Sequence, residues 1–417
     1  MMSSAGGKLQ KILESRYNLR VIEEGDRHRG RWAVLGLVTG AVFLGMSPWL
    51  MSSVVAPQWA SLWGLTRNEI GWLANVVQLG FVAGTAASAV FNLSDLLPSR
   101  RFFGLCAAGV AVANGAMVAI PTYPSALVCR FLTGLFLAGV YPPAMKMVST
   151  WFRAGRGLAI GTVVGGLIVG KAVPFLVHSA GGFRWEAIVL GASGAAALSA
   201  LLIAALYRDG PYPFARRPFS FKLARSVIAH RETRLAIAGY LGHMWELYAM
   251  WTWIPAFLAA SSIGRLSAGA IDVIAFLAIA AGGAGSLWGG WVADRRGRAF
   301  VVNLSMALSG GCAAVIGLFF GGSLWILVPL SIVWGFFVVS DSAQFSAMVT
   351  ESAPPEAVGT ALTLQTSLGF LLSMATIQAV PAIVSAKGWP WAFAGLAIGP
   401  LLGIWAIRRL GKGRIPA

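Results

Sequence analysis

Residues 134–150 read GLFLAGVYPPAMKMVST, and residues 335–351 read GFFVVSDSAQFSAMVTE. Each stretch completes a long apolar run and carries polar or helix-breaking residues in its middle. A stretch that recurs at a corresponding place in the second half of a chain indicates an internal repeat. Both copies are apolar enough to lie in membrane-spanning helices, so we expect two similar halves of six spans each.

The composition of the whole chain agrees with a membrane location. Charged residues make up 11% of the 417 residues and hydrophobic residues 57%. A soluble surface of this size needs far more charge. A bilayer core of about 30 Å needs about 20 apolar residues per helix. Twelve segments qualify, at 32–55, 70–92, 102–120, 125–147, 158–178, 186–207, 234–258, 270–292, 299–320, 324–350, 359–384 and 390–409.

These segments predict an all-α membrane protein with twelve transmembrane helices in two pseudo-symmetric six-helix bundles. The longest polar interval follows the sixth span and contains GPYPFARRPF at 210–219, whose glycine and prolines break helices. The halves should join there. We expect a cytoplasmic N-terminal segment at 1–31, bundles at 32–207 and 234–409, a cytoplasmic linker at 208–233 and a cytoplasmic tail at 410–417.

The excess of basic over acidic residues is explained by membrane topology. Lys and Arg number 32 against 15 Asp and Glu, giving a formal charge of +17, yet few lie in the expected outer loops. Membrane proteins gather basic residues in their short cytoplasmic loops. The charge therefore favours a multi-pass plasma-membrane protein, in the inner membrane if bacterial, with both termini cytoplasmic. It argues against nucleic-acid binding. The outer loops hold Arg67, Arg184, Arg265 and Lys387.

The loop after the eighth span carries a motif of known type. Residues 290–298 read GWVADRRGR, and the corresponding loop of the first half reads DLLPSRR at 95–101, without the initial glycine. Residues 290–298 closely resemble the G-x-x-x-D-R-x-G-R loop of the major facilitator superfamily. Arg130, followed by Gly134, resembles a second motif of that family. The resemblance extends over essentially the whole chain and implies the family's twelve-helix transporter fold.

Within that family, residues 141–161, YPPAMKMVSTWFRAGRGLAIG, look most similar to the anion–cation symporter branch and to the nitrate or sugar-phosphate porters. The span-five motif with a Gly-Pro pair, which many drug–proton antiporters carry, is absent, because Gly165 and Gly166 stand at that place. The resemblance therefore implies uptake of a small anion more than drug efflux.

The two loops predict a conformational latch. A carboxylate at a helix end can accept hydrogen bonds from a neighbouring helix N-terminus and pair with loop arginines, so its contacts differ between two helix arrangements. The alternative is a solvated charge cluster, because exposed ion pairs contribute little. The latch candidates are Gly290, Asp294, Arg295, Gly297 and Arg298 in one loop, and Asp95, Arg100 and Arg101 in the other.

A few ionisable residues lie inside apolar spans, where they are energetically expensive and usually face a water-filled cavity. Lys171 lies well inside the fifth span and Arg130 near the outer end of the fourth. We expect both to attract a substrate anion. The alternative for Lys171 is a charge that a buried acid neutralises.

Span seven combines groups that could carry a proton. His243 and Glu246 are neighbours at i, i+3 on one helix and could share a proton. Asp341 in span ten is a further candidate for proton coupling. Desolvation in a cavity favours the protonated carboxyl, which suits a group that loads and releases protons. The alternative for Glu246 is a fixed pair with a cation on another helix.

Further polar side chains in the spans could bind the substrate. The alternative role of the amides is to form hydrogen bonds between packed helices. The alternative role of the aromatic residues is packing. The candidates are Gln344, which follows Asp341 at i+3, Asn75, Gln78, Gln365, Tyr240 and Trp253.

The sequence carries no sign of an enzyme or of a bound cofactor or metal. Cys106, Cys129 and Cys312 lie in apolar spans without a CxxC pair, and no H-x-x-x-H or G-x-S-x-G motif occurs. We therefore expect a secondary transporter that works by alternating access and is most simply a proton-coupled symporter of a small inorganic or organic anion. Its partners would be the solute, protons and the lipid bilayer, and we expect a monomer. A proton-coupled exporter of a metabolite or drug, or a transporter-like sensor, are the alternatives.

Overall fold

The computed structural model describes residues 30–152, 155–181, 183–212 and 220–411. Nearly all of the expected N-terminal segment, part of the linker and most of the tail lie outside these residues. Within them the regular secondary structure is helical and contains no strand. The first-half helices are α2 Arg31–Gly45, α3 Met51–Trp63, α4 Arg67–Val90, α5 Leu93–Leu96, α6 Ser99–Ala119, α7 Tyr123–Leu137, α8 Tyr141–Ser149, α9 Arg156–Ser179 and α10 Trp185–Leu206.

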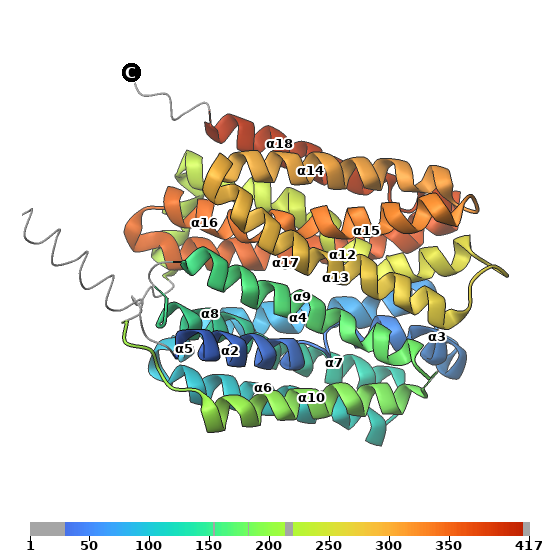
Figure 1. Ribbon diagram of the computed structural model, residues 1–417, viewed down its shortest axis with the longest axis horizontal. Coiled ribbons are helices and arrows are strands. Elements are labelled where there is room, and N and C mark those ends of the chain that lie inside the picture. Colours follow the sequence, from blue (N-terminus) through green and yellow to red (C-terminus); the bar gives the residue numbers. More distant parts are fainter. Residues whose placement is uncertain (1–29, 153–154, 182, 213–219, 412–417) are drawn as a thin grey trace, which may run out of the picture.

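The second half repeats this order of spans. Figure 1 shows α2 to α10 in one half of the molecule and α12 to α18 in the other, with α9 and α13 running alongside each other between them. The second-half helices are α11 Phe221–Ala229, α12 Arg231–Ser261, α13 Ala268–Arg296, α14 Arg298–Val315, α15 Leu324–Ser340, α16 Ser342–Ser352, α17 Val358–Lys387 and α18 Ile398–Gly411, with short 3₁₀ turns at Ile316–Phe319, Pro355–Ala357, Trp389–Trp391 and Ala394–Ala397.

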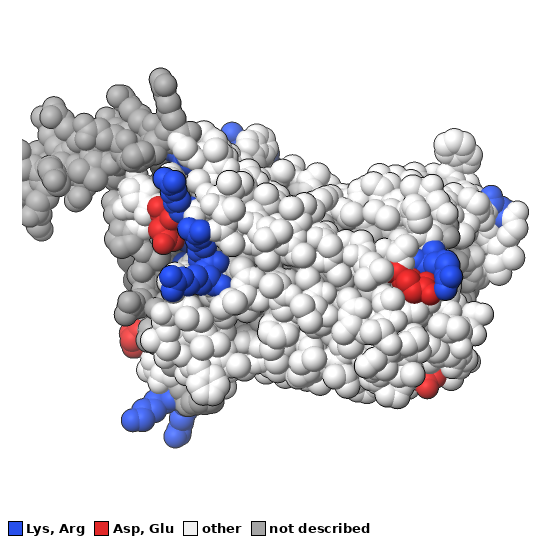
Figure 2. Space-filling model, turned by 90° about the horizontal axis from the view of Figure 1, so that it is seen from below, with Lys and Arg blue, Asp and Glu red and all other residues white. Residues whose placement is uncertain are grey.

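Ten helical segments of the described chain are long and apolar enough to cross a membrane. The expected first and seventh spans complete the set: α2 and α3 form one interrupted span, and the 31-residue α12 carries many polar side chains. Figure 2 shows the charged side chains of one face at the two ends of the molecule, with a broad uncharged band between them. The all-α fold predicted from the sequence is confirmed.

The internal repeat is visible in the bends of two spans. Span four breaks between α7 and α8, where Val140 precedes the new helix, and span ten breaks between α15 and α16 at Asp341. Val140 and Asp341 occupy the same position in the two copies of the repeat. In span four, Pro142 lies in the first turn of α8, where its missing N–H is tolerated.

The repeat also explains two glycines. A Cβ on Gly134 would lie 1.9 Å from the carbonyl oxygen of Val77 on α4, and one on Gly335 would lie 1.5 Å from that of Ala278 on α13. The two glycines share one repeat position, and each lets its helix touch the second span of its own half. Both halves therefore depend on the same close helix approach.

The halves meet along two seams, α9 with α13 and α4 with α17. Glycines keep the first seam tight: a Cβ on Gly165 would stand 3.4 Å from the carbonyl oxygen of Gly283. The ionisable residues predicted inside the spans are buried within the bundle: Arg130, Lys171, His243, Glu246 and Asp341.

Candidate functional site

Lys171 on α9 is buried at the centre of the molecule, with 2% of its surface exposed. Its Nζ donates a hydrogen bond to the hydroxyl of Tyr248 on α12 (2.8 Å) and lies 3.8 Å from the ring centroid of Trp49. Among the described residues, no carboxylate lies within ion-pair distance of it. Aromatic faces attract a desolvated ammonium. The structure thus surrounds Lys171 with aromatic rings and brings no buried acid to it.

These rings belong to an aromatic cluster, which we define as Trp49, Phe81, Tyr248, Trp251 and Phe370. The Trp49 ring lies 5.1 Å from Phe81 and 5.7 Å from both Tyr248 and Phe370, between ring centroids. Phe81 and Phe370 are 4.9 Å apart. The rings come from the turn between α2 and α3, from α4, from α12 and from α17, so they belong to both halves.

Arg130 on α7 is fully buried and is directed at backbone carbonyls. Its terminal nitrogens donate to the carbonyls of Pro48 and Trp49 (both 2.6 Å), and Nε donates to that of Leu73 (3.3 Å). The break between α2 and α3 leaves carbonyls without helical partners, and Arg130 satisfies them. It therefore positions the turn that carries Trp49 over Lys171, instead of lying beside the ammonium.

His243 on α12 contacts Asp341, at the break of span ten, with 2.9 Å between Nδ1 and Oδ1. Both side chains are buried, the pair carries opposite charges only when the imidazole is protonated, and its geometry is not that of a hydrogen bond. Glu246 faces elsewhere: Trp334 Nε1 donates to one of its oxygens (2.5 Å) and Ser309 Oγ to the other (2.9 Å). The structure brings His243 to Asp341, whereas the sequence analysis paired it with Glu246.

Three other substrate candidates take part in contacts between packed helices. Asn75 Nδ2 donates to the carbonyl of Met374 (3.2 Å), and Trp253 Nε1 donates to that of Ile377 (2.8 Å). Gln78 Oε1 accepts from the hydroxyl of Ser373. The two amides thus join α4 to α17, the alternative role considered for them.

The remaining candidates lie nearer to the buried histidine or to the latch. The Tyr240 ring lies 5.9 Å from that of His243. Gln365 is buried and its Oε1 has no hydrogen-bond partner among the described residues. Gln344 accepts from Arg298 (2.9 Å) and is thereby joined to the loop that follows α13.

The residues of the predicted latch loop occupy the end of α13, Gly297 and the start of α14, and they lie against both halves. The Asp294 carboxylate lies against the first turn of α9, 3.9 Å from where a Cβ on Gly157 would stand. Arg298 pairs with Glu351 on α16 (2.8 Å), while Arg295 lies 3.7 Å over the Trp291 ring. Gly297 ends α13 with φ of 83°, a conformation that favours glycine. Of the other latch candidates, Gly290 has open space around its Cα, Arg100 donates to the carbonyl of Ala204, Arg101 is exposed, and the side chain of Asp95 lies outside the described residues.

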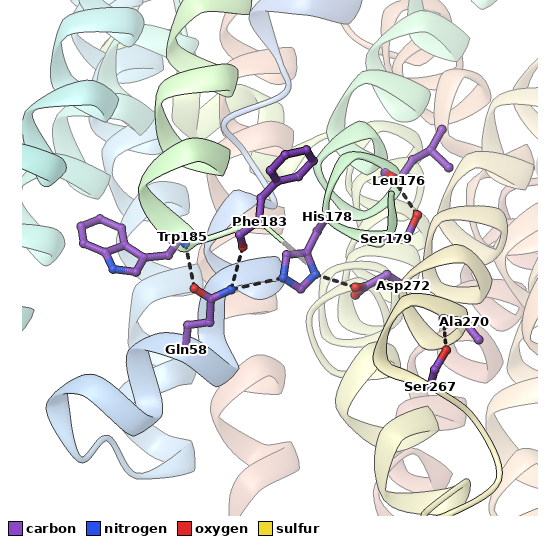
Figure 3. A network of polar contacts seen from close by, with 9 residues as sticks. All are labelled: Gln58, Leu176, His178, Ser179, Phe183, Trp185, Ser267, Ala270 and Asp272. Atoms are coloured by element: carbon purple, nitrogen blue, oxygen red, sulfur yellow. Dashed lines mark hydrogen bonds and ion pairs between the residues drawn. The ribbon is translucent and has the colours of Figure 1, made fainter. Parts of the chain in front are cut away.

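The opposite end of the bundle carries a polar network that the sequence analysis missed (Figure 3). His178 Nδ1, at the end of α9, lies 2.6 Å from Asp272 Oδ2 at the start of α13. Gln58 on α3 places Nε2 3.2 Å from His178 Nε2 and accepts from the backbone N–H of Trp185 (2.7 Å). The network joins the halves at that end. The sequence did contain a signal for this network, because His178 lies at the end of one span and Asp272 at the start of another.

Comparison with known proteins supports the motif-based resemblance. Residues 37–377 match the sequence profile of the Major Facilitator Superfamily. The chain belongs to the Major Facilitator Superfamily. Proteins of this superfamily are transporters and not enzymes, so a small-molecule substrate is the expected partner. The resemblance predicted from the two loop motifs is confirmed.

Curated relatives of this superfamily member are distant in sequence. A putative niacin/nicotinamide transporter, NiaP, of Bacillus subtilis is 22% identical over 329 residues, which cover 76% of this chain and 79% of that protein. The niacin transporter NiaP of Acinetobacter baylyi is 32% identical over 126 residues, covering 30% and 27%. The D-galactonate transporter of Escherichia coli is 26% identical over 264 residues, covering 55% and 59%.

Solved structures share the fold of this superfamily member. The nucleoside transporter NupG aligns with a TM-score of 0.69 at 14% identity and covers 91% of this chain and 99% of its own. A bacterial homologue of the human lysosomal transporter Spinster aligns with a TM-score of 0.70 at 15% identity, covering 93% and 99%. At this identity the likeness establishes the architecture alone.

Proposed function

We propose that this chain is a proton-coupled symporter of a small organic anion that works by alternating access. The observation that carries the proposal is Lys171, an ammonium at the centre of the bundle with aromatic neighbours and no carboxylate at ion-pair distance among the described residues. A buried charge is strongly disfavoured unless it is paired. A substrate carboxylate at Nζ would supply the missing opposite charge.

The relatives support an organic acid as the substrate class. One is named as a putative niacin/nicotinamide transporter, one as a niacin transporter and one as a D-galactonate transporter. Niacin and D-galactonate are small acids, whose carboxylates a single lysine can bind, whereas nicotinamide is a neutral amide. We extend that class to this chain because Lys171 supplies a matching charge in the middle of the membrane.

His243 and Asp341 form the proposed proton-coupling pair. An imidazole and a carboxylate in contact can together gain or lose one proton. Burial makes the binding of that proton sensitive to neighbouring charge. Arrival of an anion at Lys171 changes the charge in the same bundle. Glu246 receives two hydrogen bonds from its own half, so we assign it a fixed role in packing.

Alternating access requires contacts between the halves that can open at either end. At one end, Asp294 contacts the first turn of α9. At the other, His178 contacts Asp272. Both contacts join α9 to α13, on opposite sides of Lys171. We propose that one opens while the other stays closed, as residues 32–207 and 234–409 rock about the centre.

We further propose that the protein lies in the plasma membrane as a monomer, with the Asp294 end in the cytoplasm. This orientation follows the basic residues: Arg100, Arg295, Arg296 and Arg298 lie at that end, as the positive-inside rule requires.

Transport in proteoliposomes tests the proposal. Purified protein would be reconstituted, and uptake of radiolabelled benzoate, nicotinate and gluconate would be measured with and without an imposed proton gradient. We expect the gradient to drive accumulation of at least one of these acids and Lys171→Gln to abolish it. The matched control is Lys387→Gln, which removes an exposed lysine from the end of α17. Undiminished transport by Lys171→Gln, or no transport of any acid, would overturn the proposal.

A further inference from the structure

The ring contacts of the aromatic cluster cross from one half of the molecule to the other. Trp49 belongs to the first half, and the Tyr248 and Phe370 rings, each 5.7 Å away, belong to the second. Phe81 of the first half contacts Phe370 at 4.9 Å. Apolar rings thus fill the seam beside Lys171, where a solute between the halves would have to lie.

Two buried side chains in this region have unused hydrogen-bond donor capacity: the Lys171 amine, which makes one hydrogen bond, and the Trp251 indole, which makes none among the described residues. Lys171 Nζ has three N–H groups, and in the described part of the chain its hydrogen-bond partner is the Tyr248 hydroxyl alone. The indole N–H of Trp251 is buried without an acceptor, and its ring centroid lies 5.4 Å from Nζ. Buried donors normally have acceptors, so these two mark a place for an acceptor that the protein does not supply.

The two features describe one ligand. A carboxylate is an acceptor-only group that suits an ammonium and an indole N–H, and its charge suits Lys171. The planar faces and edges of the cluster suit an aromatic ring, because aromatic pairs gain energy in stacked and edge-to-face arrangements beyond their buried area. A sugar acid would instead place several hydroxyls against ring carbons, where they would lose their hydrogen bonds to water.

We propose that the transported anion is an aromatic monocarboxylate. Its carboxylate pairs with Lys171, and its ring takes a place among Trp49, Phe81, Tyr248 and Phe370. This inference rests on the proposed transport function and narrows its substrate class. The ring of the solute would replace ring contacts that now join the halves, so loading the site and rearranging the halves become one event.

Binding measurements on the full-length protein in nanodiscs test this inference with four acids and a neutral analogue. The probes are benzoate, nicotinate, cyclohexanecarboxylate, gluconate and benzamide. Cyclohexanecarboxylate keeps the charge and the approximate size of benzoate but lacks the aromatic faces. We expect benzoate and nicotinate to bind, cyclohexanecarboxylate to bind about tenfold more weakly, and gluconate and benzamide to give no thermal shift.

Variants then assign the two parts of the ligand. Lys171→Gln should remove benzoate binding, while Trp49→Leu and Phe370→Leu should each raise the Kd for benzoate about threefold to tenfold. Trp49→Phe keeps an aromatic ring and should restore most of the affinity if Trp49→Leu folds poorly. The matched control is Trp325→Leu, because the Trp325 side chain on α15 is 91% exposed.

The outcomes separate this inference from the proposal on which it rests. Proton-driven transport of gluconate without binding of benzoate would overturn the aromatic assignment and leave the organic-anion symporter standing. Equal affinities for benzoate and cyclohexanecarboxylate would overturn it in favour of an apolar acid of any shape. Transport of no acid at all would overturn both.

Discussion

His243 and Asp341 are in contact across the second half of the protein, 2.9 Å apart at Nδ1 and Oδ1, with 1% and 2% of their side chains exposed. Asp341 precedes the first residue of α16, at the break of span ten. The pair therefore joins the middle of α12 to a bend in the span that carries the repeat. Protonation of either partner changes the attraction across that bend.

Asp341→Asn should uncouple transport from the proton gradient. The amide keeps the size of the side chain but cannot exchange a proton near neutral pH, so gradient-driven accumulation should fall about tenfold or more. Exchange of substrate across the membrane without a gradient should persist. Substrate-dependent proton entry, followed with a pH-sensitive dye inside proteoliposomes, provides the measurement. Glu356→Gln, an exposed acid before α17, is the control. Full coupling in Asp341→Asn would show that the proton travels elsewhere.

Glu246→Gln should weaken folding and leave coupling intact. The Glu246 carboxyl group accepts hydrogen bonds from Trp334 and Ser309, and a typical intramolecular hydrogen bond contributes about 0.5–1.5 kcal/mol. We expect a melting temperature several degrees lower in detergent, with the ratio of protons to solute unchanged. Trp334→Phe, which removes the donor, should lower stability in the same direction. A stable Glu246→Gln protein that has lost proton-driven uptake would reverse the roles given to Glu246 and Asp341.

Gly335→Ala should prevent normal packing of α15 against α13. The added methyl would lie 1.5 Å from the carbonyl oxygen of Ala278, so one of the two helices must move. Overpacking typically costs about 1–3 kcal/mol, and a clash with backbone should lie at or above that range. Size-exclusion profiles and expression yield report the effect. Gly134→Ala should match it in the first half. Gly311→Ala on α14, where the added methyl would meet no side chain and no neighbouring helix within 4 Å, should behave as wild type.

His178→Asn should favour opening of the end that carries Asp272. The substitution removes a 2.6 Å contact that joins α9 to α13, while the Asp294 contact at the other end remains. Spin labels on Ser179 and Gly269, which face each other across this seam, should show a larger population of long distances. The control is Arg184→Gln, whose partner Glu186 lies in the same half. An unchanged distance distribution would mean that this pair does not hold that end closed.

Much of the fold could be predicted from the sequence because lipid imposes a length and an apolar character on every span. Span seven was predictable despite its polar residues, because apolar residues separate them over the length of the span. The repeat at residues 134–150 and 335–351 predicted the two halves. The structure shows in addition that both copies bend at the same position.

The partners of the buried polar groups could not be predicted, because they lie on other helices. A helical wheel placed Glu246 beside His243, and only the packing of α12 against span ten reveals Asp341 as the contact. Arg130 was expected near the anion. Its actual acceptors, the carbonyls of Pro48 and Trp49, exist because span one breaks at Pro48, whereas we expected one continuous span over residues 32–55.

The two copies of the repeat share a bend at Val140 and Asp341, but the residues at the bend differ in chemistry. Both halves inherited the same kink, and one of them alone holds an acid at it. The acidic side chain at the bend therefore belongs to the second half alone, and valine occupies the corresponding position of the first half. The backbone of the two halves is therefore alike at this bend, while the electrostatic environment differs between them.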